Sequence, residues 1–561
     1  MRIFLLFFLL SCSVFSQNPY PQDYFRSPLD IPIILAGTFA ELRSNHFHSG
    51  IDIKTKRVEG LKVYGIADGY VSRIKIAHFG YGKALYVTHP NGYTSVYAHL
   101  QKFSPEIEAY VKQKQYKKES FEIELFPTSD ALKIKKGDVI AYSGNTGSSS
   151  GPHLHFEIRD NAERPINPML FGVDVKDTTK PIISNVYAYP IGKNSHVNGS
   201  NKKQKLRLIP QTNGNYKIED INAYGTIGFA IQTIDRQDLA ANKNGVYNIK
   251  TYYNGIENFE IDFKRFSFAE TKHLNRLIDY EHFKTKKQRL QKLFLETNNP
   301  LSLYNNIIDD GYITINDNTA SVYKAKISDF KGNETVLDLT INGLNKLPSD
   351  IEPEVVMQNY VQCDQVCNLN EGNISVTFPK NTFYDSFFID FSVKNDTLTL
   401  HKPILPVKKN FTISFDISQY KNENIDQLYI AELVGWKNYP SYSSTKRKGN
   451  ILTTRTKDLG TYVLARDTIA PTIKPVRFKN GSWMSKYRFL KVKIDDKITG
   501  ISSYRATING KWILMEYSHK KKTLTYDFND GISTDTKNNL KVIVTDNVGN
   551  STTFETTFYR K

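Results

Sequence analysis

The chain has 561 residues, with 74 Lys and Arg against 57 Asp and Glu, so its formal net charge is +17. That length exceeds a single hydrophobic core, and we expect about three to five domains. The basic charge favours anionic polymers as partners, but the sequence has no nucleic-acid-binding motif, so we expect no nucleic acid partner.

The N-terminus has the pattern of an export signal. Met1 and Arg2 precede a short apolar block at 3–10, which is too short to span a bilayer. We therefore predict a signal peptide at 1–16, with the mature chain starting at Gln17. In the alternative, Cys12 becomes the lipidated first residue of a lipoprotein.

No later stretch approaches the roughly 18 consecutive apolar residues that a membrane span requires. We expect an exported protein without a transmembrane span, located in the periplasm, at the cell envelope or outside the cell, or lipid-anchored through Cys12.

Residues 28–172 are predicted to be mostly strand. An Asn-Gly pair at 91–92 separates two β-rich runs, which indicates a hairpin that places His99 at a strand end. The charged segment 104–136 is expected to be an insertion over the sheet rather than part of it, with a helix at about 110–120. A Gly/Ser loop at 144–151 allows a tight turn just before His153.

Five polar residues of this segment are candidates for one pocket. In a strand, side chains alternate between faces, so His153 and His155 would project to the same side. His48 and Asp52 are four residues apart and share a face of a strand or a helix. A fifth group, His99, is brought by the hairpin.

These residue types suit a zinc hydrolase. Catalytic zinc takes three protein ligands, imidazoles and a carboxylate, and leaves a fourth position to water. His48, Asp52 and His155 fit that set, and the ion would activate the water and polarise a carbonyl. The unligated His99 and His153 would take the proton of the water and stabilise the oxyanion.

The motifs at 48–52 (HSGID), 97–100 (YAHL) and 151–157 (GPHLHFE) resemble those of the M23 family of zinc metallopeptidases, of the lysostaphin and LytM type. The resemblance covers about residues 35–172. It implies a compact antiparallel β domain with its site in a groove, one Zn²⁺ ion, and peptidoglycan cross-bridge peptides as substrate.

By the same resemblance, His48, Asp52 and His155 are the metal ligands, and His99 and His153 are the catalytic histidines.

Three questions stay open in the sequence. His46 lies two residues before His48 and is read as a rim residue, with replacement of His48 as ligand as the alternative. The segment 104–136 is longer than the usual link in the family and could cover the groove. Rival functions are a non-catalytic M23-like activator of wall hydrolases, whose signature is a missing ligand, and an envelope adhesin or scaffold.

Beyond residue 172 the sequence repeats itself. DTTKPII at 177–183 returns as DTIAPTI at 467–473, and ISDFKGN at 327–333 returns as VTDNVGN at 544–550. Each pair would bracket a β-sandwich of immunoglobulin type. The predicted modules are a β-sandwich with a helical insertion at 177–345, a β-rich module at 350–465, and an immunoglobulin-like β-sandwich at 467–561, which position the enzyme on the envelope or on envelope proteins.

Two smaller predictions concern the modules. The apolar spacing in 270–294 suits one or two amphipathic helices, on which His273 and His282 would be partly exposed. Cys363 and Cys367 are expected to form a small disulfide. The predicted fold class is mainly β, with an M23-like antiparallel β domain followed by about three immunoglobulin-like β-sandwich modules.

Overall fold

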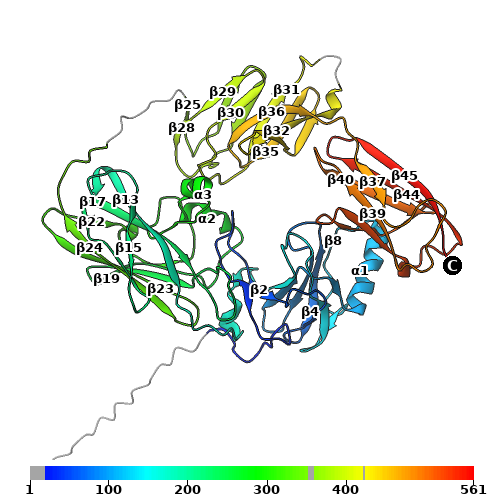
Figure 1. Ribbon diagram of the computed structural model, residues 1–561, viewed down its shortest axis with the longest axis horizontal. Coiled ribbons are helices and arrows are strands. Elements are labelled where there is room, and N and C mark those ends of the chain that lie inside the picture. Colours follow the sequence, from blue (N-terminus) through cyan, green and yellow to red (C-terminus); the bar gives the residue numbers. More distant parts are fainter. Residues whose placement is uncertain (1–18, 351–358, 421–423) are drawn as a thin grey trace, which may run out of the picture.

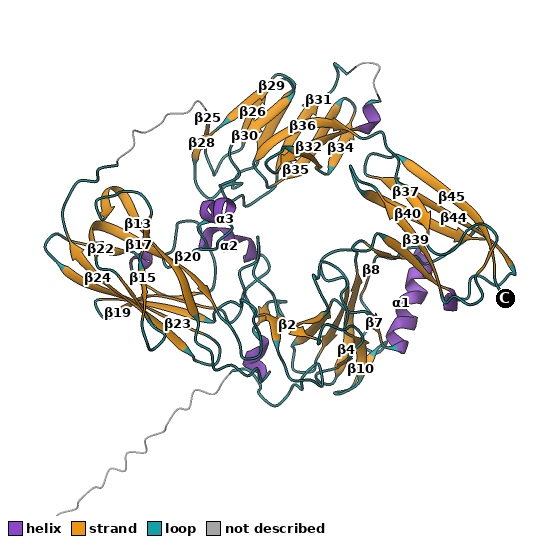
Figure 2. Cartoon of the chain, viewed as in Figure 1, coloured by secondary structure: helices purple, strands orange, loops and turns teal. Residues whose placement is uncertain are grey.

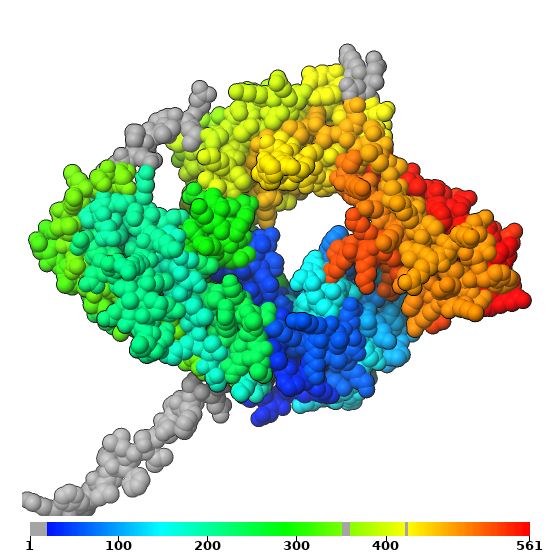
Figure 3. Space-filling model, in the orientation of Figure 1, coloured from blue at the N-terminus to red at the C-terminus, as the bar shows by residue number. Residues whose placement is uncertain are grey.

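The computed structural model describes residues 19–350, 359–420 and 424–561. The predicted signal peptide at 1–16, with Cys12, lies outside these residues. Four β-rich domains follow one another around a central opening, which the space-filling view also shows (Figures 1 and 3). Among the described residues, no helix is both long and apolar enough to cross a membrane.

The N-terminal domain is built on a main sheet with the strand order β1-β2-β11-β6-β5-β4-β8, in which neighbours pair antiparallel. Its strands, with β9 and β12 beside this path, are β1 (Leu35–Gly37), β2 (Ile51–Lys54), β4 (Gly69–Ile76), β5 (Lys83–Thr88), β6 (Thr94–Ala98), β8 (Ile123–Leu125), β9 (Lys133–Ile134), β11 (His153–Arg159) and β12 (Pro165–Ile166). A small second sheet contains β3 (Lys62–Tyr64), β7 (Lys102–Phe103) and β10 (Val139–Tyr142).

The hairpin predicted at Asn91–Gly92 joins β5 to β6, whose last pair is Thr88 with Thr94. Every residue of β6 is buried, and so is all of β5 except its last residue. Strands covered on both faces are rigid supports. The centre of the sheet therefore holds the residues at its strand ends in fixed positions.

The segment 104–136 differs in part from the expectation. It contains the predicted helix, α1 (Pro105–Lys118), which starts with Pro at its first turn and has Glu in its first turn and Lys in its last. However, β8 and β9 both pair with β4 and extend the main sheet. The expectation that the segment lies outside the sheet was therefore wrong for these strands, because Ile123, Leu125 and Ile134 bury against its core.

The second domain continues the core of the first. One cluster of buried side chains runs from Leu29 to Ile341, and Phe39 and Phe47 of the first domain contact Phe266 of the second. The strands form a continuous twelve-stranded sheet with β13 (Ile182–Val197), β14 (Gln204–Leu206), β15 (Leu208–Pro210), β16 (Tyr216–Ile218), β17 (Ile221–Ile234), β18 (Asn248–Tyr253), β19 (Ile256–Asp262), β20 (Gln291–Lys292), β21 (Tyr304–Ile307), β22 (Ile313–Ile315), β23 (Ala320–Ser328) and β24 (Glu334–Gly343).

The helical insertion of the second domain contains α2 (Leu274–Leu277) and α3 (Tyr280–Lys286). His273 and His282 are only 7% and 6% exposed, so the expectation of partial exposure was wrong. The reason lies outside the helices: the Nδ1 atom of His273 is 2.8 Å from the hydroxyl of Tyr384 in the third domain, and the ring of His282 packs against Tyr187 of β13.

The third domain, from residue 359, has two five-stranded sheets and one two-stranded sheet around its own core. Its strands are β25 (Asn359–Val361), β26 (Cys367–Glu371), β27 (Ile374–Phe378), β28 (Phe387–Ile389), β29 (Phe391–Lys394), β30 (Thr397–Leu400), β31 (Phe411–Asp416), β32 (Leu428–Val434), β33 (Tyr439–Tyr442), β34 (Thr445–Lys448), β35 (Ile451–Thr456) and β36 (Gly460–Arg466). Cys363 and Cys367 are free and pack against this core as small apolar side chains, so the disulfide prediction was wrong.

The fourth domain packs a four-stranded against a five-stranded sheet around a third core (Figure 2). Its strands are β37 (Thr472–Pro475), β38 (Ser482–Trp483), β39 (Phe489–Asp495), β40 (Ile501–Ile508), β41 (Lys511–Trp512), β42 (Glu516–Ser518), β43 (Thr523–Asp527), β44 (Lys537–Asp546) and β45 (Ser551–Tyr559).

The fourth domain returns to the first and closes the ring (Figure 1). The Lys83 ammonium, 5% exposed as a residue, lies 3.0 Å from a carboxylate oxygen of Glu516. On α1, Lys112 and Tyr116 both contact the carboxylate of Asp530, at 2.5 and 2.8 Å. The helix of the 104–136 segment is thus used as a docking surface for the last domain.

Candidate metal centre

Three neighbouring strands bring the predicted site residues together. His155 on β11 is paired with Asp52 on β2 and, on its other side, with Ala98 at the end of β6. His99 follows Ala98 directly and adopts a left-handed backbone conformation with φ 58°. The prediction that His153 and His155 share one face agrees with the ring of each contacting His99.

His48, Asp52 and His155 form a tight buried cluster. The Oδ1 atom of Asp52 lies 3.0 Å from Nε2 of His48 and 2.9 Å from Nδ1 of His155. The two ring nitrogens are themselves 3.0 Å apart. Burial opposes charge on Asp52, but contacts with His48, His153 and His155 hold the pKa of this carboxyl well below its usual range.

The outer ring nitrogens of both histidines are already occupied. Nδ1 of His48 is 2.7 Å from the carbonyl oxygen of Thr38, and Nε2 of His155 is 2.8 Å from a carboxylate oxygen of Glu157. Carbonyl and carboxylate oxygens only accept hydrogen bonds, so these nitrogens carry the protons. Burial opposes charge on His155, but its hydrogen bonds to Asp52 and Glu157 raise its pKa to about 9, so a proton lies between the rings when no metal is bound. A metal that displaced this proton would meet the lone pairs of both inner nitrogens beside the Asp52 carboxylate.

Converging lone pairs repel one another unless a cation lies between them. Two imidazole nitrogens and one carboxylate oxygen are the ligand set of a catalytic zinc ion, and the carbonyl and carboxylate behind the rings are the usual outer partners of such ligands. The donor set therefore fits a divalent transition metal such as zinc.

His99 and His153 lie beside the cluster with their rings 4.8 Å apart. Nδ1 of His99 is 2.9 Å from the carbonyl oxygen of Thr146, and Nδ1 of His153 is 2.8 Å from that of Gly151. Each therefore donates its Nδ1 proton to the backbone and leaves Nε2 for the pocket. Burial, with the neighbouring histidines, lowers the pKa of His99 to about 3, so this ring is neutral at pH 7.

Glu157 is a functional residue to which the sequence assigned no role. It is fully buried and accepts hydrogen bonds from Ser49 at 2.6 Å, from Tyr81, from His155 and from Arg159 at 2.6 Å. Burial would raise the pKa of this carboxyl, but Arg159 and His155 hold it below the ordinary value. Its place two residues after His155, on the same strand face, was the available signal.

Close packing against β11 requires glycine at position 50. A Cβ atom built on Gly50 would lie 2.3 Å from the carbonyl oxygen of Phe156. The segment between His48 and β2 therefore lies directly against β11, and only glycine allows this approach.

The groove over the cluster is narrowed by the second domain. Its lining includes Arg43, Tyr81 and His46 together with Phe268 and Thr271, which belong to the second domain. No residue of 104–136 lines it, so that segment does not cover the groove. His46 is exposed and bonds Asn45 at 2.7 Å, outside the three-ligand cluster, as expected for a rim residue.

Comparison with known proteins agrees with this geometry. Residues 46–116 and 126–168 match the family model of Peptidase family M23, and residues 358–467 match that of the Zu5-like domain. The gap in the M23 match contains the last two residues of α1 and the whole of β8.

Similar proteins match about a quarter of this chain. The DD-carboxypeptidase/endopeptidase Mpg of Neisseria meningitidis is 32% identical over 139 residues, which cover 25% of this chain and 26% of the relative. The peptidoglycan DD-endopeptidase ShyB of Vibrio cholerae is 32% identical over 122 residues, or 22% of each chain. The catalytic domain of lysostaphin from Staphylococcus simulans has 23% identity and a TM-score of 0.18, covering 28% of this chain and 95% of that one.

This chain thus spans about a quarter of the length of the curated relatives named above. All five residues of the pocket lie within 46–116 and 126–168, the residues that match the family model. The N-terminal domain of this chain is therefore a Peptidase family M23 domain.

Proposed function

We propose that this protein is an exported, zinc-dependent endopeptidase that hydrolyses peptide cross-bridges of peptidoglycan. The observation that carries the proposal is the convergence of His48 Nε2, Asp52 Oδ1 and His155 Nδ1 within 3.0 Å, with protons fixed on the outer nitrogens. The names of the relatives, which include a peptidoglycan DD-endopeptidase, support the substrate class.

In this proposal His48, Asp52 and His155 hold the zinc ion. When bound, zinc supplies Lewis acidity toward the scissile carbonyl and activates a water molecule as nucleophile at neutral pH. Glu157 and the Thr38 carbonyl keep both imidazoles in the tautomer that this coordination requires.

His99 and His153 perform the proton transfers. Each presents Nε2 to the pocket because Nδ1 is bound to a backbone carbonyl. His99 is neutral at pH 7, so its Nε2 atom is free to accept a proton from the attacking water and to return it to the leaving amine. In its protonated form, Nε2 of His153 donates a hydrogen bond to the carbonyl oxygen as this oxygen becomes negative.

A non-catalytic activator role is the less favoured function. Such M23-like domains lack a ligand or a catalytic histidine, and here all five positions are filled and share one pocket. The envelope location belongs to the same proposal, with attachment through Cys12 as its lipid-anchored form.

The test is mass spectrometry of purified peptidoglycan after incubation with the zinc-loaded chain from residue 17 to 561. Loss of cross-linked dimers is expected with the intact protein and not with His153→Ala, and the fragment masses identify the cleaved bond. An unchanged wall with the intact protein, at full zinc occupancy, would refute the peptidoglycan endopeptidase.

A further inference from the structure

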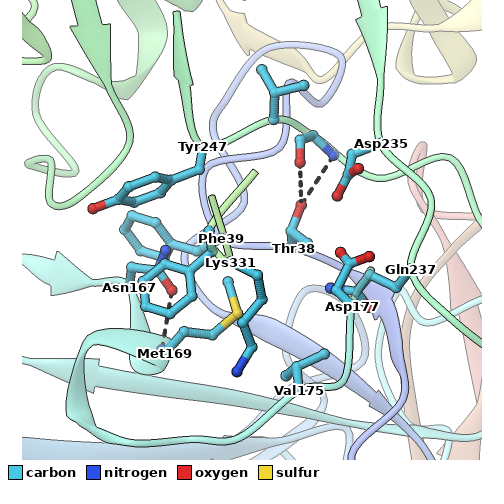
Figure 4. Close-up of a pocket in the computed structure, with 13 residues that line it drawn as sticks. Thr38, Phe39, Asn167, Met169, Val175, Asp177, Asp235, Gln237, Tyr247 and Lys331 are labelled. Carbon is cyan, nitrogen blue, oxygen red and sulfur yellow. Dashed lines mark hydrogen bonds between the residues drawn. The ribbon is translucent and has the colours of Figure 1, made fainter. Parts of the chain in front are cut away.

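The two sequence repeats outside the M23 domain each assemble three aspartates. In the second domain these are Asp177, Asp235 and Asp329, whose carboxylate oxygens lie within 4.8 Å of one another. Asp177 and Asp235 line a pocket at the border with the first domain, where Figure 4 shows their carboxylates on the same side of the pocket, near Gln237.

Hydrogen bonds fix two of these carboxylates. Asp329 accepts bonds from the backbone and the side-chain amide of Asn333, at 2.9 and 2.6 Å. The same amide reaches the carbonyl oxygen of Asp177 at 3.2 Å, and one Asp177 carboxylate oxygen accepts a bond from the Thr179 backbone. The segments 177–183 and 327–333, which carry the two repeated motifs, are therefore joined by one hydrogen-bond network.

The fourth domain provides an internal comparison. There Asp546, Asn550 and Asp467 make the same contacts, and Asp496 takes the third carboxylate position. One oxygen of Asp496 accepts three backbone N–H groups of the following turn, at 2.6 to 3.1 Å. The third carboxylate of this cluster is thus satisfied by the protein itself.

The third carboxylate of the second domain is not satisfied in this way. Asp235 is 2% exposed, and its Oδ1 atom has no hydrogen-bond partner in the described part of the chain. Gln237 lines the same pocket, is 6% exposed, and its Oε1 atom is also unpartnered among the described residues. Two buried oxygens without a donor at one pocket indicate a missing positive ligand.

The electrostatics point the same way. Burial, together with Asp177 and Asp329, raises the pKa of Asp235 to about 8. Burial likewise raises the pKa of Asp177 to about 6. Lys331 lines the pocket, but its ammonium pairs with Asp174 at 2.8 Å. Buried carboxylates that repel one another are stable as anions only with a cation among them.

We propose that Asp177, Asp235 and Asp329, with Oε1 of Gln237, bind one hard divalent cation of the Ca²⁺ type. Oxygen-only ligands select such a cation over zinc. Calcium–oxygen distances of about 2.3–2.6 Å let ligands lie up to about 4.6–5.2 Å apart across the ion. The spread of at most 4.8 Å among the three carboxylates fits that span.

A cation here would stabilise the wall behind the metal centre. The backbones of Asp235 and Asn244 pair with each other at 2.8 and 2.9 Å. The next residue, Gly245, exchanges two hydrogen bonds with the Thr38 hydroxyl, and the Thr38 carbonyl accepts the bond from His48. The cation therefore supports the loop that orients one proposed zinc ligand.

The experiment is calorimetric titration of Ca²⁺ into the zinc-loaded chain, with Asp235→Asn as test and Asp496→Asn as matched control. We expect one Ca²⁺ per chain, at least tenfold weaker binding with Asp235→Asn, and unchanged binding with Asp496→Asn. His155→Ala is expected to bind Ca²⁺ as the unmodified protein does, which separates this proposal from that of the zinc site.

A second readout protects against a folding defect. Without Ca²⁺, Asp235→Asn removes repulsion and should melt at a higher temperature than the unmodified protein; with Ca²⁺ the order should reverse. No binding by the unmodified protein up to about 10 mM Ca²⁺, ten times the weak end of affinities for extracellular calcium modules, would overturn the proposal. Equal binding by Asp235→Asn, or loss only with Asp496→Asn, would overturn it as well.

Discussion

Glu157→Gln tests the support of the metal centre with a change of one atom. Four donors converge on the two oxygens of Glu157: Ser49, Tyr81 and His155 on one, and Arg159 on the other. A glutamine offers a single oxygen, so at least one donor must face an amide N–H group. If the amide lies toward His155, the favoured tautomer of this ring is lost. If it lies toward Arg159, a residue only 4% exposed loses its buried anionic partner.

The magnitude follows from the burial of this pair. Removing one partner of a buried ion pair costs about 3 to 5 kcal/mol. Losing the outer partner of a metal-bound histidine lowers metal affinity about 10- to 100-fold. We therefore expect Glu157→Gln to lower the free energy of unfolding of the zinc-free protein and to weaken zinc binding by these amounts.

The assays are denaturant unfolding of the zinc-free protein and zinc competition against a coloured chelator. The matched control is Glu163→Gln, because Glu163 also pairs with Arg159, at 3.0 Å, but its side chain is 58% exposed. That control should change stability by no more than about 1 kcal/mol and leave zinc affinity unchanged. If Glu157→Gln bound zinc with an affinity within twofold of the unmodified protein, Glu157 would not be needed to hold the metal-binding tautomer of His155.

The other predictions concern the ligand roles, the ring and the histidine at the junction between the second and third domains. His155→Ala should abolish zinc binding, whereas His153→Ala should retain zinc and lose turnover, as measured by metal analysis and peptide cleavage. Glu516→Gln should weaken the contact between the first and fourth domains by about 1 to 3 kcal/mol, because the buried Lys83 ammonium loses its carboxylate partner. Small-angle scattering should then show a wider ring. Burial, with nearby lysines, lowers the pKa of His273 to about 4, so the unfolded chain binds the extra proton and stability should fall as the pH drops from about 6.5 to 4.

Each of these has its own control. Equal zinc loss in the two histidine variants would show that ligand and catalytic roles are divided wrongly. Glu119→Gln removes an exposed partner of Arg505 at the same closure and should leave the ring unchanged in scattering, so an equal opening would argue against a special role of Glu516. His273→Gln should flatten the acid dependence of unfolding; an unaltered pH slope would assign that dependence to other groups.

Some features were readable from local sequence because their cause is local. Side chains alternate along a strand, so the sequence placed His153 and His155 on one face, and Asn91–Gly92 fixed the hairpin that delivers His99. The M23 motifs then grouped the remaining two pocket residues with these. The repeated phrases beyond residue 172 located two further β domains for the same reason, since turn and strand-entry residues act within a few positions.

Other features depended on residues far apart in the chain. Phe268 and Thr271 line the groove because the second domain shares one continuous core with the first. No local sequence pattern predicts such a contact between domains. His273 and His282 are buried by long-range partners, although their helix spacing suggested exposure. Cys363 and Cys367 had a disulfide spacing, yet packing against the core of their domain left them free.

The sequence by itself determined which residues could hold a metal and move a proton, because motif spacing and strand alternation are properties of short segments. Only the tertiary structure decided what stands around them: Glu157 behind His155, the second domain over the groove, and Asp177, Asp235 and Asp329 at one pocket. These contacts join segments separated by many residues, and they form because folding buries apolar faces that lie far apart in the chain.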